Sequence, residues 1–166
     1  MERNYIATKA LLGEFRNHLR ITSTDMDAVL EQSLEVGIER SEAEIGRVIA
    51  LSEFKGVQMP FSQTLSLRGP VVVVSLVKVD GAVVDPSHYT TAPWSLTFDE
   101  TVEGNTVELA YQAGMEQIPS MIKGAIFLFG GRYFNNPTDA PEEIDRTAAA
   151  NLLRPYRTWG NTDGLH

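Results

Sequence analysis

The sequence has 166 residues and no cysteine, so no disulfide staples its fold and no thiolate can serve as a nucleophile or metal ligand. Basic residues are also scarce, because 14 lysines and arginines face 22 aspartates and glutamates, a formal net charge of −8. Nucleic-acid-binding proteins neutralise phosphates with lysine and arginine, and this balance argues against that class. The start of the chain lacks the apolar core of a signal peptide, so we expect synthesis in a cytoplasm.

Long apolar runs are likewise absent, apart from one stretch at residues 118–136, IPSMIKGAIFLFGGRYFNN. Its unbroken apolar part is too short for a bilayer, which takes about 20 apolar residues, so no membrane partner is expected. Apolar side chains follow helical spacing on one face and also fall outside that face, at Phe127, Leu128 and Phe134. A helix that is apolar on several sides packs on several sides. We therefore expect either the central helix of a small domain or a helix shared with a neighbouring subunit.

Catalytic and metal-binding motifs are missing too. The three histidines, His18, His88 and His166, are scattered, and no cluster of histidines and acids has the spacing of a zinc site. Neither a G-x-S-x-G nucleophile motif nor a Walker phosphate loop occurs. We predict no catalytic, cofactor-binding or metal-binding residue, and no enzyme. A small hydrolase is the alternative, and it would need one pocket that gathers His88, Asp85 and Asp99.

Hydrophobic periodicity predicts an α+β fold. Helical spacing favours helices over 6–20 and 24–46, joined by a short polar turn, and further helices over 118–134 and 140–154. Between them, residues 48–116 carry β-branched and alternating stretches, which favour about five antiparallel strands. The expected architecture is a four-helix frame, with two N-terminal and two C-terminal helices, and an inserted antiparallel β subdomain.

A single domain over residues 1–166 follows from this pattern. Its helical part is expected over 1–47 and 117–158, and its β subdomain over 48–116. Asp80-Gly81 lies between alternating apolar residues, which is a strong signal for a two-residue β-hairpin turn.

Negative charge concentrates in residues 61–118, where Arg68 and Lys78 are the only basic residues. The same segment holds seven acids, at Asp80, Asp85, Asp99, Glu100, Glu103, Glu108 and Glu116. Such a segment is typical of a solvated surface. The sharper interpretation is a surface past which DNA moves without binding, because the acids repel phosphates.

Three glycines interrupt the apolar helix. Glycine costs a helix about 1 kcal/mol against alanine, so it usually marks close packing or a helix end. We predict a close helix crossing at Gly124 and a weakened helix near Gly130 and Gly131. The alternative is a hinge or a contact with a neighbouring subunit.

Aromatic residues supply the candidate interface. One helix face cannot bury Phe127, Tyr133 and Phe134 together, so we predict that these side chains divide between the subunit's own core and a neighbour.

The end of the chain adds three more candidates. Pro155 is expected to end the last helix, so that Tyr156, Arg157 and Trp159 continue as an extended segment. Large aromatics and arginine are enriched at interface anchors. We expect this segment to dock on another protein, the alternative being that it folds back on its own domain.

Several segments occur in a characteristic order: EFRNHLRITSTDMDAVLEQSLEVGIERSEAEIGR, VDGAVVDPSHYTT, VELAYQAG, IPSMIKGAIFLFGGRYFNN and LLRPYR. In this order they resemble the opening helix pair, inserted β segment, apolar helix and closing signature of the head–tail connector (adaptor) proteins of tailed bacteriophages. The resemblance runs from about Leu11 to Trp159. The family commonly continues the apolar helix with bulky residues where this chain has Gly130 and Gly131.

The resemblance implies a structural virion protein without a cofactor. Such a protein forms a homo-oligomeric ring, expected to be a dodecamer, beneath the dodecameric portal protein. The ring joins the DNA-filled head to tail or neck proteins and lines a channel through which DNA passes without specific binding. It is made in the bacterial host cytoplasm and ends in the neck of the virion.

Two further classes remain as alternatives. A tail-side neck component, such as a stopper or tail terminator, is typically dominated by strands, so the four expected helices count against it. A small terminase subunit would show a basic recognition helix, and none of the expected helices has one.

Overall fold

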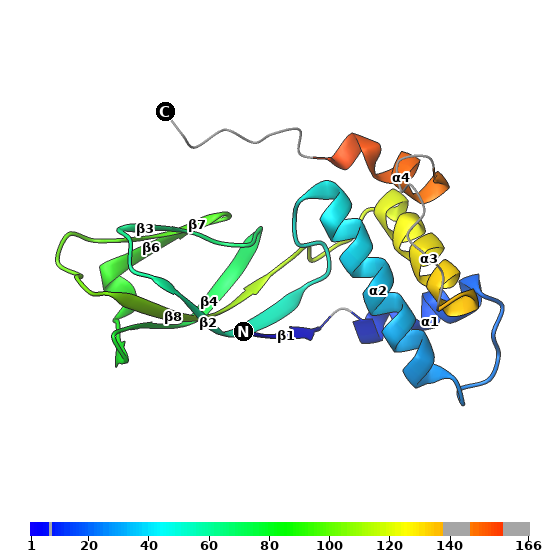
Figure 1. Cartoon of the computed structure of the whole chain (residues 1–166), viewed down its shortest axis with the longest axis horizontal. Coiled ribbons are helices and arrows are strands. Elements are labelled where there is room, and N and C mark those ends of the chain that lie inside the picture. Colours follow the sequence, from blue (N-terminus) through cyan, green and yellow to red (C-terminus); the bar gives the residue numbers. More distant parts are fainter. Residues whose placement is uncertain (7, 138–146, 158–166) are drawn as a thin grey trace. The chain divides into compact units, whose positions relative to one another are not determined.

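The computed structural model describes residues 1–6, 8–137 and 147–157. The chain forms two compact units (Figure 1). The β unit comprises Met1–Ile6 and Ala50–Glu116, and the helical unit comprises Ala7–Ile49 and Gln117–His166. The predicted α+β class is confirmed, since the described residues form four α-helices and two antiparallel sheets.

The β unit contains eight strands among its described residues, three more than the sequence predicts. The first sheet has the order β1-β2-β8-β4-β5, with β1 at Glu2–Tyr5, β2 at Ser52–Pro60, β8 at Thr106–Ala113, β4 at Val71–Val79 and β5 at Ala82–Val83. The second sheet has the order β3-β7-β6, with β3 at Thr64–Ser66, β7 at Ser95–Phe98 and β6 at Tyr89–Ala92. A short 3₁₀ helix, η1 at Pro86–His88, precedes β6.

The hairpin predicted at Asp80-Gly81 is confirmed. Val79 pairs with Ala82, and both turn residues have a positive φ, 48° at Asp80 and 86° at Gly81. The Asp80 carboxylate accepts the Thr106 backbone N–H at 2.9 Å, which lowers the pKa of Asp80 below its ordinary value. This side chain therefore ties the β4–β5 turn to the start of β8.

Strand β1 lies where the sequence predicts the helical part, over residues 1–47, so this boundary is corrected. Glu2–Tyr5 instead pairs antiparallel with β2, from Glu2 opposite Lys55 to Tyr5 opposite Ser52. The Arg3 guanidinium lies 4.2 Å from the Tyr5 ring centroid, and its Nη2 donates to Ser52 Oγ at 3.1 Å. A short polar strand of this kind is fixed by its distant partner, which local periodicity does not reveal.

The helical unit contains α1 at Thr8–His18, α2 at Asp27–Ile45, α3 at Ser120–Asn135 and α4 at Ala148–Leu153. Helix α3 packs against α2 and α4, and its Phe127 ring lies 5.5 Å from the Phe15 ring of α1. Neighbours on three sides explain why α3 is apolar nearly all round. The large apolar side chains that it leaves exposed are Met121 and Leu128.

The closest helix crossing lies at Gly130 and not at Gly124, where the sequence places it. A Cβ added at Gly130 would lie 2.8 Å from the Ser33 carbonyl oxygen of α2, whereas one at Gly124 would meet only Leu152 Cδ1, at 3.4 Å. Gly37 faces Gly130 from α2, since its added Cβ would lie 2.9 Å from the Gly130 nitrogen. Two glycines therefore let the α2 and α3 backbones meet.

The last helix is shorter than predicted in the described part of the chain. Helix α4 begins at Ala148, and the Thr147 hydroxyl caps it by accepting the Ala150 N–H at 3.1 Å. Residues 140–146, the first part of the predicted helix, lie outside the described residues.

Candidate functional site

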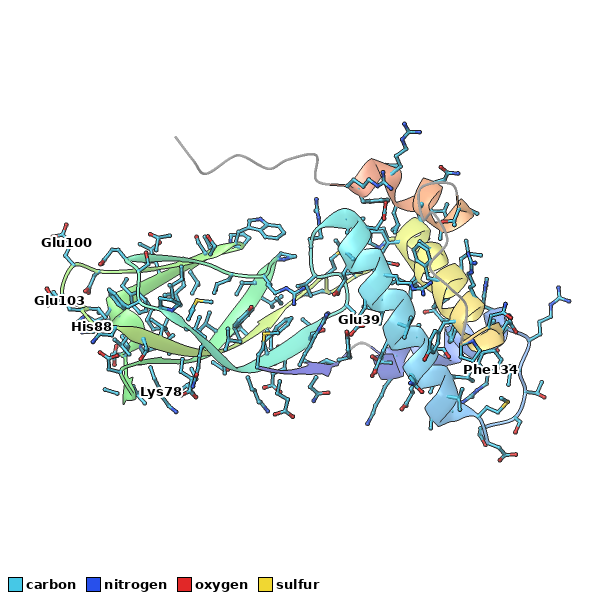
Figure 2. All side chains as sticks on the ribbon, viewed as in Figure 1. Glu39, Lys78, His88, Glu100, Glu103 and Phe134 are labelled. Carbon is cyan, nitrogen blue, oxygen red and sulfur yellow. The ribbon has the colours of Figure 1, made fainter. Side chains whose placement is uncertain are left out.

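The three aromatic candidates of α3 occupy different environments. Phe127 is 8% exposed and packs against the rings of Phe15 and His18, with centroids 5.5 Å away in each case. It belongs to the core of its own helical unit. Tyr133 and Phe134, in the last turn of α3, are half-buried (Figure 2 labels Phe134), so part of each side chain faces solvent.

Among the C-terminal candidates, Tyr156 does not lie in the expected extended segment. Residues Arg154–Tyr156 form a 3₁₀ helix, η3, directly after α4, because Pro155 is accommodated in the first turn of a new helix. The Arg157 guanidinium forms an ion pair with Glu44, and Arg47 Nη2 donates to the Tyr156 carbonyl oxygen at 3.4 Å. Tyr156 and Arg157 thus lie against the end of α2 in their own unit. Trp159 lies outside the described residues.

Arg157→Ala is expected to destabilise the helical unit by about 1–3 kcal/mol, because it leaves the Glu44 carboxylate unpaired. The Glu44 side chain is only 13% exposed, so water cannot fully replace the guanidinium. Chemical unfolding followed by circular dichroism measures the change. Arg154→Ala removes the same charge from an exposed position in η3 and should stay within about 0.5 kcal/mol of the parent. Equal effects of the two substitutions would contradict the assigned role of the Glu44 pair.

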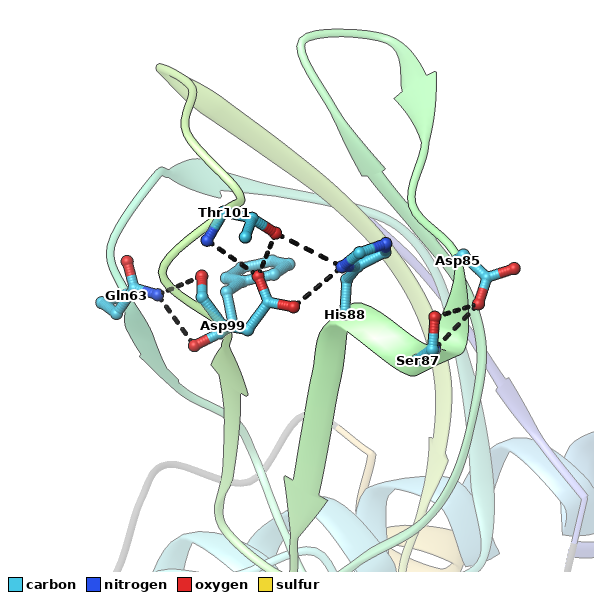
Figure 3. A network of polar contacts seen from close by, with 7 residues as sticks. Gln63, Asp85, Ser87, His88, Asp99 and Thr101 are labelled. Atoms are coloured by element: carbon cyan, nitrogen blue, oxygen red, sulfur yellow. Dashed lines mark hydrogen bonds and ion pairs between the residues drawn. The ribbon is translucent and has the colours of Figure 1, made fainter.

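A polar cluster lies in the loops that flank β6 and β7 (Figure 3). His88 Nδ1 lies 2.8 Å from Asp99 Oδ2 and 3.3 Å from Thr101 Oγ1. Asp85 is not part of this contact, since its carboxylate accepts from Ser87 N at 2.9 Å and from Ser87 Oγ at 2.6 Å. The hydrolase alternative names His88, Asp85 and Asp99 together. The β6–β7 hairpin brings two of them, His88 and Asp99, into contact although they are 11 positions apart in the sequence.

The geometry of this cluster does not match a catalytic triad. In a triad, the acid holds one ring nitrogen of the histidine while the nucleophile contacts the other. Here Asp99 and Thr101 both contact Nδ1, and the Thr101 hydroxyl also donates to Asp99. A neighbouring open pocket of about 440 Å³ is lined by His88 and Thr101 but by neither Asp85 nor Asp99. This pocket therefore does not bring together His88, Asp85 and Asp99, as the hydrolase alternative requires.

Thr101→Val is expected to raise the pKa of the Asp99 carboxyl from about 2 toward its ordinary 3.8. The hydrogen bond from the Thr101 hydroxyl is the largest cause of the lowered pKa, and the bond from His88 comes second. A lowered pKa stabilises the folded loop above pH 3.8, and this contribution is lost as the pH falls toward 2. NMR titration of the Asp99 carboxyl carbon reports the pKa directly. Thr101→Ser keeps the hydroxyl and should keep the low pKa; a raised pKa in both variants would refute the assignment.

A metal site and a membrane-spanning helix each have structural requirements, which the described residues do not meet. Within them, no three histidines, cysteines or acids are grouped so that they could hold a metal ion. No helix in that part of the chain is long and apolar enough to cross a bilayer.

Comparison with solved structures identifies the fold. A chain in the "Neck of empty GTA particle computed with C6 symmetry" superposes with a TM-score of 0.67 at 20% identity, over 95% of this chain and 96% of that one. Chains from the "Virion of native gene transfer agent (GTA) particle" and the "Neck of native GTA particle computed with C12 symmetry" give TM-scores of 0.66 and 0.65, at 21% and 19% identity over the same shares. No protein-family model matches the sequence, and the search of curated proteins returned no match. The chain therefore shares the fold of gene transfer agent neck structures over nearly its whole length, and the predicted neck-protein fold is confirmed.

Proposed function

We propose that this protein is a structural component of a virion neck, which forms a ring below the portal and joins the DNA-filled head to tail components. The observation that carries the proposal is the fold shared with neck structures over 95% of the chain. Those necks were computed with C6 and C12 symmetry, which supports a ring of identical copies. A closed ring satisfies every head-to-tail interface between subunits without a free end.

The polar chemistry of the molecule supports a structural role rather than catalysis. Fold alone does not decide function, so the site must be considered as well. The His88–Asp99–Thr101 cluster holds a loop in place and leaves no activated nucleophile. A neck ring needs no nucleophile. It needs surfaces that bind copies of itself, the portal and tail or neck proteins.

We assign the ring or partner contacts to the partly exposed aromatic side chains near the ends of the helical unit. Tyr133 and Phe134 are the first candidates, because Phe127 is already buried in its own core. Tyr156 and Arg157, both half-buried, are the second group, and Trp159 outside the described residues stays a candidate from the sequence. For Arg157, docking on a partner must preserve or replace its ion pair with Glu44.

Reconstitution with the portal protein of the same particle tests the proposal. The purified full chain should add to the portal as a ring, visible by electron microscopy and as a stepwise mass increase in native mass spectrometry. Binding to a tail tube in place of the portal would favour the stopper or tail-terminator alternative. A chain that binds neither would overturn the assignment to the neck.

Duplex DNA is expected to pass this protein without binding at physiological salt. The residues from 61 to 118 contribute two basic side chains against seven acids, so no local cluster offsets phosphate repulsion. Gel-shift titration should show no complex at sub-micromolar protein, and the same result is expected for duplexes of different sequence. A salt-sensitive complex under these conditions would exclude a passive channel wall.

A further inference from the structure

Two hydrogen-bonded loops form a platform in the β unit. The platform, residues 67–71 and 93–94, is held by backbone bonds from Leu67 N to Trp94 O at 2.8 Å and from Val71 N to Pro93 O at 2.7 Å. Pro70 O accepts a further bond from Gly114 N at 2.8 Å, which ties the platform to the end of β8. These three bonds connect the two loops to each other and to β8 within one subunit.

The platform presents an aromatic ring to solvent. Trp94 lies against Gly69, where an added Cβ would be 2.7 Å from the ring atom Cε3, so only glycine leaves room for the indole. The tryptophan nevertheless remains 41% exposed, and the neighbouring Val72 and Val73 are 46% and 47% exposed. Tryptophan is one of the residue types most enriched among the anchors of protein–protein interfaces.

The platform also presents a cation, Arg68, for which the described part of the chain supplies no ion pair. Two of the other basic side chains of the β unit pair within it, Lys55 with Glu53 at 2.9 Å and Lys78 with Glu108 at 3.4 Å. Arg68 is exposed and has no carboxylate within ion-pair distance among the described residues. An arginine beside an exposed tryptophan favours an acidic segment that also carries an apolar side chain.

Such a segment lies at the other end of β7. Residues 99–104, which we call the tip loop, contain Glu100 and Glu103, both exposed and without an ion pair among the described residues (Figure 2). Val102 stands between them in the sequence, half-buried. Strand β7 runs from the platform at Trp94 to the tip loop at Asp99, so the two surfaces lie at opposite ends of this strand in one copy.

We propose that the platform of one copy docks the tip loop of a second copy of this chain. Arg68 pairs with Glu100 or Glu103 of the neighbour, and Trp94 covers its Val102. The two surfaces differ, so the contact is head-to-tail, and it can repeat from copy to copy around a ring. In placing this contact within a ring, the inference rests on the proposed function.

A charge exchange between two variants tests the contact in the full-length chain. Arg68→Glu and, separately, Glu100→Lys with Glu103→Lys should each lose concentration-dependent self-association in sedimentation experiments, because like charges then meet at every junction. Mixing the two variants should restore association, since each platform then meets a tip loop of opposite charge. Lys55→Glu reverses a charge of the same unit elsewhere and should associate like the parent.

Trp94→Ala provides a measure that does not depend on charge. Loss of an interface anchor should weaken association roughly 30-fold, whereas an exposed ion pair alone would change it only about fivefold. Circular dichroism should show all variants folded. A parent chain that stays monomeric at every concentration, or variants that fail to recover on mixing, would overturn the contact. Rings that form on the portal equally well with Arg68→Glu would overturn it while leaving the proposed function intact.

Discussion

Replacing Gly37 with alanine is expected to lower the free energy of unfolding by about 2 kcal/mol, although alanine is the better helix former. A Cβ at this position would lie 2.4 Å from the Ile126 carbonyl oxygen and 2.9 Å from the Gly130 nitrogen. Both atoms belong to the backbone of α3, so relief requires the two helices to move apart. Overpacking of this kind costs about 3 kcal/mol, and the better helix propensity of alanine offsets about 1 kcal/mol of it.

Gly13 is the matched control for this substitution. It lies in the interior of α1, is exposed, and an added Cβ would meet no atom within 4 Å. Gly13→Ala should therefore stabilise the protein by up to about 1 kcal/mol. Urea unfolding followed by circular dichroism gives both values. A Gly37→Ala variant as stable as the parent would show that the helices do not meet as closely as the structure places them.

The same crossing shows where sequence reasoning succeeds and where it stops. Apolar spacing identifies α2 and α3 as helices, since periodicity is a property of each segment alone. It does not reveal which glycine faces another backbone, because that depends on how two distant helices pack. The sequence therefore predicts the close helix crossing at Gly124, whereas in the structure Gly37 meets Gly130.

The hairpin turn and strand β1 show the same difference between local and distant causes. The hairpin at Asp80-Gly81 was predictable, because the turn type requires the positive φ angles that these residues adopt readily. Strand β1 was not, since Glu2–Tyr5 is short and polar and takes its conformation from β2, about fifty residues later.

Contacts of the candidate site depend still more on distant partners. The Glu44–Arg157 pair joins α2 to the residue after η3, and no local pattern marks either side chain. The sequence identified Arg157 as an interface residue by its type alone. In the structure Arg157 pairs with Glu44 of its own unit. Tyr133 and Phe134 are therefore the stronger candidates for the interface.

Phe134→Asp is expected to prevent ring formation while leaving the subunit folded. Phe134 is half-buried in the last turn of α3, so part of its ring is available to a neighbour. Truncating an aromatic interface anchor costs about 2 kcal/mol or more, which corresponds to roughly a 30-fold loss of affinity at each interface. Every junction of a ring carries the same substitution, so the losses accumulate around the closed ring.

Asn135→Asp separates the loss of the ring from the added charge. It places an acid on the next residue of α3, at an exposed position, without removing an aromatic side chain. Rings with the portal should form with Asn135→Asp and fail with Phe134→Asp, as counted by electron microscopy, while circular dichroism shows both chains helical. Since Phe134 also packs partly within its own unit, thermal unfolding must accompany the assay. A folded Phe134→Asp chain that assembles like the parent would remove Phe134 from the interface and leave Tyr133 and the C-terminal residues to provide the contact.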